Sequence, residues 1–139
     1  MIYILDCGSS KTKFIHQMVD EYMECRTIPF LDFIFEESKD VNGIIISGAP
    51  ILVTEENIES YIESSHWIKT TNIPILGICF GHQLIGIQFG SIAKKMKEDR
   101  EMQEVEVFES SPIFNESPKT IICIFTLIFL SSTLIRFET

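Results

Sequence analysis

The chain has 139 residues, of which 45% are hydrophobic and 22% charged, a balance typical of one folded globular domain. Eleven basic and twenty acidic residues give a formal net charge of −9, which repels nucleic-acid phosphates and anionic lipids, so we predict no nucleic-acid partner. The four cysteines form no C-x-x-C pair and the first residues do not resemble a signal peptide, so we expect a cytoplasmic protein.

The first half of the chain predicts strands and a helix in alternation. The apolar run Ile2–Leu5 predicts a strand, and residues 7–10 after it predict a turn and a helix cap. Apolar residues recur every three or four positions from Lys11 to Glu24, which predicts a helix whose apolar stripe packs on a sheet. A short strand is expected at Ile28–Phe30. The β-branched run Gly43–Ile46 is typical of a central parallel strand covered on both faces.

The second half continues the same alternation. Thr54 can cap a helix whose buried side extends to Ile68. The apolar segment Pro74–Cys79 predicts a strand, and a helical pattern through Leu84–Gln88 follows it directly. Valines alternate with glutamates over residues 104–109, which predicts a half-buried strand. Repeated strand–helix order predicts an α/β fold, with an open, mostly parallel sheet and helices on both faces.

The segment from Gly77 to Gly81 has the pattern glycine-x-nucleophile-x-glycine where a predicted strand turns into a predicted helix. In such an elbow the residues two before and two after the nucleophile crowd together, so Gly77 and Gly81 must be small. The helix that follows favours a thiolate at Cys79, and the N–H of Phe80 would form half of an oxyanion hole. The alternative is that Cys79 is simply a small buried hydrophobic residue.

Three motifs in register resemble class I glutamine amidotransferases, including the amidotransferase domain of GMP synthases. GICFGHQ at 77–83 resembles the nucleophile motif, ILDCGSS at 4–10 the first strand and turn, and SGAP at 47–50 the oxyanion loop. The resemblance covers roughly residues 1–118. It implies a flavodoxin-like fold and hydrolysis of glutamine to glutamate and ammonia through a cysteine thioester, with the ammonia passed to a separate synthetase subunit.

The resemblance also assigns roles to individual residues. Cys79 would be the catalytic nucleophile, Phe80 and Ala49 would supply the oxyanion N–H groups, and Gln83 and Gly48 would bind the substrate glutamine. No metal and no cofactor are implied. The family usually has a second glycine where this chain has Ala49, and alanine resists a positive φ, so the oxyanion hole is expected to form less readily.

One departure concerns the catalytic base. The family completes its triad with a histidine and a glutamate from a later H-P-E motif, and this sequence has no histidine after His82. A positioned base contributes about 10²–10⁴-fold, so we expect little or no glutaminase activity. His82 would face away from the nucleophile, and His16 and His66 read as surface or structural residues. A catalytically inactive or truncated binding module, or another cysteine hydrolase, therefore stays open.

The last residues differ in composition from the rest, which suggests a domain at 1–118 followed by a divergent apolar tail at 119–139. The fifteen residues from Ile121 to Ile135 are uncharged, but a helix that spans a bilayer requires about 20 residues. A strand over Ile121–Leu130 is therefore favoured over a membrane tail. A third reading is an altered end that packs poorly, and we expect the fold to be incomplete at its C-terminus.

Overall fold

The computed structural model describes residues 1–35, 40–51, 53, 58–93, 102–106 and 120–124. The chain divides into two compact units, one formed by residues 1–94 with 130–139 and the other by residues 95–129. Each unit is described by itself. The predicted boundary at residue 118 lies outside the described residues and stays a prediction.

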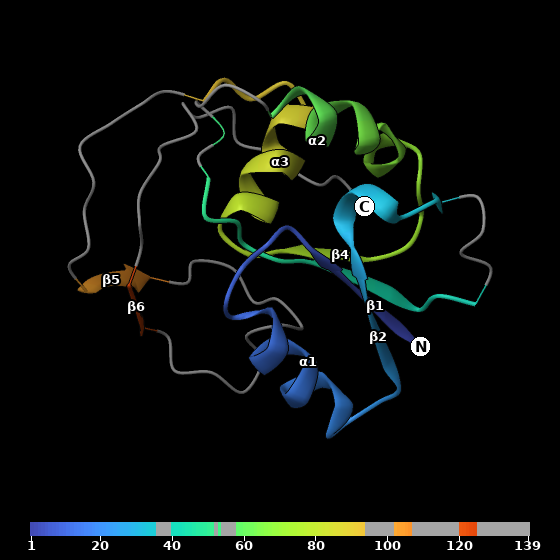
Figure 1. The fold of residues 1–139 in the computed structure, drawn as a ribbon. Helices are drawn as coiled ribbons and strands as arrows, with labels where there is room; N and C mark the ends of the chain where they lie inside the picture. Colours follow the sequence, from blue (N-terminus) through green and yellow to red (C-terminus); the bar gives the residue numbers. More distant parts are fainter. Residues whose placement is uncertain (36–39, 52, 54–57, 94–101, 107–119, 125–139) are drawn as a thin grey trace. The chain divides into compact units, whose positions relative to one another are not determined.

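The first unit is built on a four-stranded sheet in which every described pairing is parallel (Figure 1). Its strands are β1 (Ile2–Asp6), β2 (Cys25–Pro29), β3 (Gly43–Ile46) and β4 (Ile75–Gly77), in the order β2-β1-β3-β4. The register sets Ile4 beside Ile45 and Ile45 beside Leu76. Because all four strands run in one direction, their carboxyl ends, and the loops that follow them, meet at one edge of the sheet.

Helices cover both faces of this sheet, as Figure 1 shows. The helix α1 (Thr12–Asp20) packs against β1 and β2 on one face. On the other face α3 (Phe80–Gln88) packs against β3 and β4, and α2 (Glu59–Ser64) packs against α3. Among the described residues, two short 3₁₀ helices, Phe30–Asp32 and His66–Lys69, lie in the connections. The predicted α/β architecture of the flavodoxin-like kind is therefore confirmed.

The first helix differs from the prediction in length and in packing. It ends at Asp20 rather than continuing to Glu24. Ile15 is half-buried, whereas Met18 and Tyr22 keep 67% and 83% of their surface exposed. The apolar residues of this segment occupy two neighbouring stripes of the helix, and only one of them faces the sheet. The prediction that the whole stripe packs on the sheet is therefore wrong.

The segment predicted as a second long helix is divided into two pieces. The helix α2 begins at Glu59 with Ile58 in its N-cap position, so Thr54 is not its cap. It ends before Ser65, whose buried hydroxyl donates to the carbonyl of Ile62 at 2.9 Å. That bond uses a carbonyl that a continuing helix would need, because serine side chains compete with the helical ladder for backbone partners. A 3₁₀ turn follows instead.

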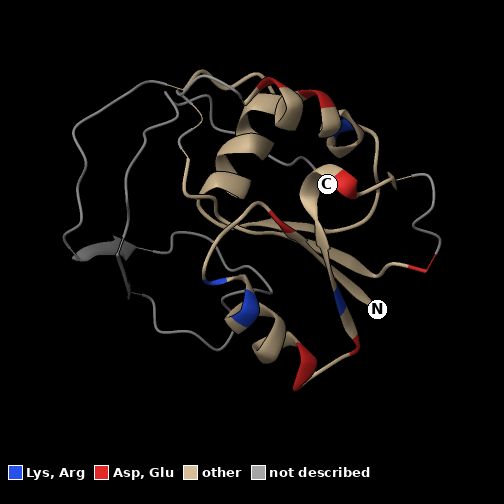
Figure 2. Ribbon diagram, in the orientation of Figure 1, with Lys and Arg blue, Asp and Glu red and all other residues tan. Residues whose placement is uncertain are grey.

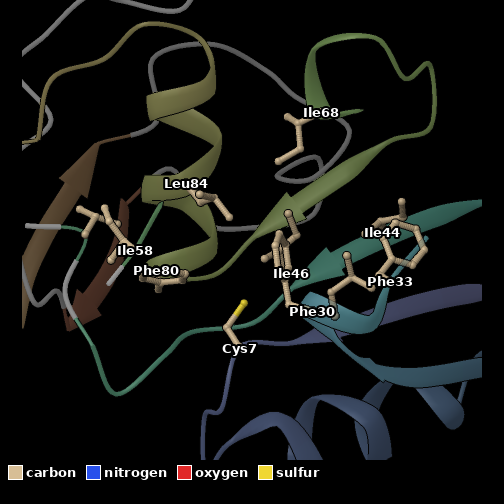
Figure 3. Packing of buried hydrophobic residues seen from close by; sticks show 11 residues of the cluster. Cys7, Phe30, Phe33, Ile44, Ile46, Ile58, Ile68, Phe80 and Leu84 are labelled. Carbon is tan, nitrogen blue, oxygen red and sulfur yellow. The ribbon is translucent and has the colours of Figure 1, made fainter. Parts of the chain in front are cut away.

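The core of the first unit lies between the sheet and the α2–α3 face (Figure 3). Phe80 and Leu84 of α3 are almost completely buried, with 1% and 0% of their surface exposed. The ring of Phe80 packs edge-on against Tyr61 with 5.2 Å between ring centres. The other large side chains that are fully buried come mainly from the strands: Ile4, Leu5, Phe30, Ile44 and Ile46. This packing fixes the start of α3 on the end of β3.

The second unit contains an antiparallel pair of strands, β5 (Met102–Glu106) and β6 (Thr120–Ile124). Val105 lies in β5, as predicted, and residues 107–109 of the predicted strand lie outside the described residues. The strand β6 agrees with the strand reading of the tail as far as Ile124, and the part after it is not described. In the described residues no helix has the length and apolar character needed to cross a bilayer.

Candidate active site at the carboxyl edge of the sheet

Cys79 occupies the turn that joins β4 to α3. The strand ends at Gly77, the helix begins at Phe80, and Cys79 stands in the N-cap position with φ 53° and ψ −106°. Among the described residues it is the single non-glycine residue with a positive φ, a conformation that costs of order 1–3 kcal/mol in a side-chain-bearing residue. Cys79 is exposed to solvent and its thiol is free. The predicted strand–elbow–helix geometry is thus present, and it presents Cys79 to solvent.

The two glycines of the elbow are required by close backbone contacts. A Cβ added at Gly77 would lie 2.5 Å from the amide nitrogen of His82 and 2.6 Å from the carbonyl carbon of Gly81. A Cβ at Gly81 would collide with the carbonyl oxygen of Ile46 and lie 2.8 Å from its Cβ. Real Cβ atoms essentially never come so near to backbone atoms. The crowding expected from the glycine spacing is confirmed, and it lets α3 start directly on β3.

Ser47, the first residue after β3, connects the three loops of the carboxyl edge. Its side chain is fully buried, and its hydroxyl oxygen accepts a hydrogen bond from the N–H of Cys7 at 2.9 Å. Its carbonyl accepts from the N–H of Gly81 at 3.2 Å, and its own N–H donates to Leu5 at 3.0 Å. The loops that follow β1, β3 and β4 are therefore joined through one residue. Sequence reasoning missed this role, although a serine directly after an all-apolar buried strand is a signal for it.

The loop after β3 lies against the elbow. A Cβ at Gly48 would be 3.6 Å from the Cβ of Cys79, an ordinary van der Waals contact. Ala49 has a negative φ, so the strain expected from alanine at this position does not arise in this structure. Within the described part of the chain, the N–H groups of Ala49 and Phe80 donate no hydrogen bond. One of these two N–H donors lies in the loop after β3 and the other at the first residue of α3, on either side of Cys79. Their role in an oxyanion hole stays a prediction.

Gln83 lies one turn into α3, where its N–H donates to the carbonyl of Cys79 at 3.0 Å. Its side chain is buried, with 5% of its surface exposed. A bound glutamine could therefore contact only the small exposed fraction of the Gln83 side chain. The assignment of Gln83 and Gly48 to substrate binding stays a prediction.

The three histidines occupy different parts of the first unit. His16 Nδ1 lies 3.0 Å from the hydroxyl of Thr27, on the α1 side of the sheet. His66 Nδ1 lies 3.2 Å from Oε1 of Gln88, at the end of α3 farthest from Cys79. His82 is exposed on the first turn of α3. The structural role expected for His16 and His66 agrees with these contacts.

Cys7 is the other cysteine near this edge, and its chemistry is opposite to that of an active-site thiol. It keeps 3% of its surface exposed and belongs to the core. Burial raises the pKa of its thiol from 9.0 to about 12, the hydrogen bond with Ser47 lowers it to a smaller extent, and the charge of Asp6 raises it. Cys7 therefore stays protonated at neutral pH and supports the fold.

Comparison with known proteins gives the same family as the motifs. The sequence model of the family "Glutamine amidotransferase class-I" matches residues 3–126. The chain is 32% identical over 128 residues to one subunit of the glutamine-hydrolyzing GMP synthase of Pyrococcus abyssi, a match that covers 86% of this chain. It is 36% identical over 118 residues to the glutamine-hydrolyzing GMP synthase of Ruthia magnifica, covering 83% of this chain and 22% of that protein.

A solved structure agrees with the sequence matches. A candidate GMP synthase subunit from Thermoplasma acidophilum superposes with a TM-score of 0.77 at 28% identity, covering 91% of this chain and 64% of that one. The chain likewise spans 63% of the length of the Pyrococcus abyssi protein. The family match extends over most of the sequence, and the nucleophile elbow, the loop after β3 and the sheet order lie where the motifs require them. The chain belongs to the class I glutamine amidotransferase family.

Proposed function

We propose that this domain acts on glutamine through Cys79. The Cys79 sulfur, as thiolate, attacks the side-chain amide carbon, and the carbonyl oxygen takes the negative charge between the N–H groups of Phe80 and Ala49. The carbon–nitrogen bond then breaks, and nitrogen leaves as ammonia after it gains a proton. Water attacks the resulting glutamyl thioester, which releases glutamate and restores the thiolate.

The observation that carries this proposal is the backbone of Cys79. An exposed cysteine is held at φ 53° directly before a helix, beside a loop in which the N–H of Ala49 has no acceptor among the described residues. A strained conformation persists only where the surrounding structure enforces it, and such residues cluster at functional sites. The names of the relatives, which are glutamine-hydrolysing enzymes, support glutamine as the substrate.

The second candidate is a binding module that takes up glutamine without turning it over. It is favoured by the placement of the histidines, because His16 and His66 have partners elsewhere and His82 follows the elbow on its own helix. Without a positioned base, proton transfer to the leaving ammonia must come from water, which slows turnover by about 10²–10⁴-fold. The two candidates share the same nucleophile and differ in whether the slowed reaction still releases ammonia.

A synthetase would be the consumer of the ammonia. Several relatives are named as one subunit of a glutamine-hydrolyzing GMP synthase, which supports a separate protein as the acceptor. We propose that any such partner docks at the carboxyl edge of the sheet, because Cys79 opens there and ammonia is lost if it must diffuse through bulk water.

The test combines covalent labelling with turnover. The protein is incubated with a glutamine analogue that carries an electrophilic ketone in place of the amide, and the mass of the peptide containing Cys79 is measured. Ammonia release from glutamine is followed in parallel. We expect labelling at Cys79, together with ammonia release that is about 10²–10⁴-fold slower than with a positioned base.

Two variants make the outcome specific. Cys79→Ser should abolish labelling and ammonia release, whereas Cys25→Ser, which removes a half-buried thiol elsewhere, should preserve both. Labelling without measurable ammonia release would favour the binding module. Absence of both, with the fold intact by circular dichroism, would overturn the proposal.

A further inference from the structure

Three side chains with different metal-binding atoms come together where α1 ends and β2 begins. His16 and Asp20 are four residues apart and therefore lie on one side of α1, and Cys25 is the first residue of β2. Their ligand atoms, an imidazole nitrogen, a carboxylate oxygen and a thiol sulfur, all lie within 4.8 Å of one another. His16 and Cys25 are half-buried and Asp20 is exposed.

The distances suit a tetrahedral metal ion. The sulfur of Cys25 lies 3.6 Å from Nδ1 of His16. A tetrahedral zinc ion bound at about 2.1 Å from nitrogen and 2.3 Å from sulfur holds these two atoms roughly 3.6 Å apart. Thr27 Oγ1, which lies 3.0 Å from the same Nδ1, adds a polar neighbour. The pair is therefore already spaced as it would be around the ion.

The charges of α1 are arranged so that a cation at its end would be favourable. A helix prefers acidic residues in its first turn and basic residues in its last, because of its dipole. This helix has neither, and it ends in Asp20, with Lys11 and Lys13 at its start (Figure 2). The carboxylate of Asp20 therefore lies at the negative end of the helix dipole, and a bound metal ion would compensate both negative charges.

We propose that His16, Asp20 and Cys25 form a binding site for a zinc-class divalent ion, with water as the fourth ligand. Thiolate together with imidazole favours borderline-soft ions of this class, whereas magnesium and calcium prefer all-oxygen sites. A pocket of about 550 Å³, lined by residues of β1, α1 and β2 that include His16 and Thr27, opens beside the cluster. It gives the fourth ligand access to the ion.

The site is separate from the elbow. Cys25 pairs with Ile2 at the beginning of the parallel register, so it lies at the amino edge of the sheet, whereas Cys79 follows the carboxyl end of β4. The ion would join the last turn of α1 to the first residue of β2 across residues 21–24. Its expected effect is to stabilise this connection, and its presence does not depend on the function proposed for Cys79.

Cobalt provides the direct test, because a cobalt–thiolate bond gives a charge-transfer absorption band. The full chain, without a histidine tag, is reduced, stripped with a chelator and titrated with Co²⁺. We expect the band to saturate at one ion per chain, to disappear on addition of Zn²⁺, and to be accompanied by a higher thermal unfolding temperature. No saturable band, or saturation that Mg²⁺ reverses as well as Zn²⁺ does, would overturn the proposal.

Variants locate the bound ion. Cys25→Ser should lose the band, and Asp20→Asn should keep it with an affinity lower by about 10-fold or more. Asp20 is exposed, so its variant reports on binding even where Cys25→Ser fails to fold. Cys79→Ser is the matched control and should leave the titration unchanged. A band that is lost in Cys79→Ser, or an unaltered affinity in Asp20→Asn, would contradict this site.

Discussion

Gly81 brings the first turn of α3 into direct contact with the backbone of β3. Because a Cβ at this position would overlap the carbonyl of Ile46, we expect Gly81→Ala to lower the free energy of unfolding by about 1–3 kcal/mol. Urea unfolding followed by circular dichroism measures it. Gly48→Ala is the matched control, since its nearest contact would be 3.6 Å, and it should stay within about 0.5 kcal/mol of the parent. Equal effects of the two substitutions would refute this explanation of the elbow.

Cys7 makes the stability of the chain sensitive to alkaline pH. Its pKa is about 12 in the folded protein and 9.0 without burial, so the unfolded chain ionises first as the pH rises. The contribution of the neutral thiol to the free energy of unfolding is complete below pH 9. It is lost between pH 9 and pH 12, by about 1.4 kcal/mol per pH unit. Cys7→Ala lacks this titration. Urea unfolding at pH 8 and pH 10 should show the advantage of the parent over Cys7→Ala shrinking, and a constant difference would contradict the assignment.

At the level of elements, α3 and α1 bind to the sheet in different ways. Leu84 of α3 is fully buried, whereas Met18 of α1 keeps 67% of its surface exposed. We expect Leu84→Ala to cost about 2–5 kcal/mol because it leaves a cavity, and Met18→Ala to change stability by less than about 0.5 kcal/mol. Thermal and urea unfolding of both variants provide the comparison. A large loss with Met18→Ala would mean that its stripe is covered in solution.

The same contrast explains how far the sequence could predict these elements. Continuous apolar runs located β1 and β3, because a buried parallel strand admits few polar residues. An apolar run also located β4, although this strand is half-exposed in the described sheet. The start of β2 was missed, since Cys25–Thr27 carries polar residues that an edge strand tolerates. Periodicity also could not tell which of two neighbouring stripes of α1 faces the sheet. The break at Ser65 depends on a side-chain hydrogen bond that no apolar pattern reveals.

The candidate site was predictable for a steric reason. The spacing of Gly77, Cys79 and Gly81 is required by atoms that nearly touch, so it is visible in the sequence itself. Contacts between distant segments leave no such pattern. The hydrogen bond between Cys7 and Ser47 spans forty residues, and the cluster of His16, Asp20 and Cys25 depends on how a helix end meets a strand. These features became visible only in the structure.

At the scale of the whole molecule, the nucleophile depends on pairings between distant parts of the chain. The strand β1 pairs with β3 in a register that sets Ile2 beside Gly43, and the N-terminal amine donates to Asn42 at 2.6 Å. Parallel strands joined across such separations form slowly, because the chain loses loop entropy before their contacts stabilise it. The turn at Cys79 packs on β3 and so cannot be held in place before this sheet exists.

The reactivity of Cys79 can therefore report when the sheet has formed during refolding. During refolding from urea, we expect its labelling by the electrophilic glutamine analogue to begin only when the native circular dichroism signal of the sheet has returned. Samples quenched at intervals and analysed by mass spectrometry test this order, with iodoacetamide as a reagent that labels the unfolded thiol as well. Labelling by the analogue ahead of the sheet would show that recognition needs only the local turn. Because the turn at Cys79 packs on β3, its thiol becomes reactive toward the analogue only late in folding. A newly synthesised chain would therefore react through Cys79 only after β1 and β3 have paired.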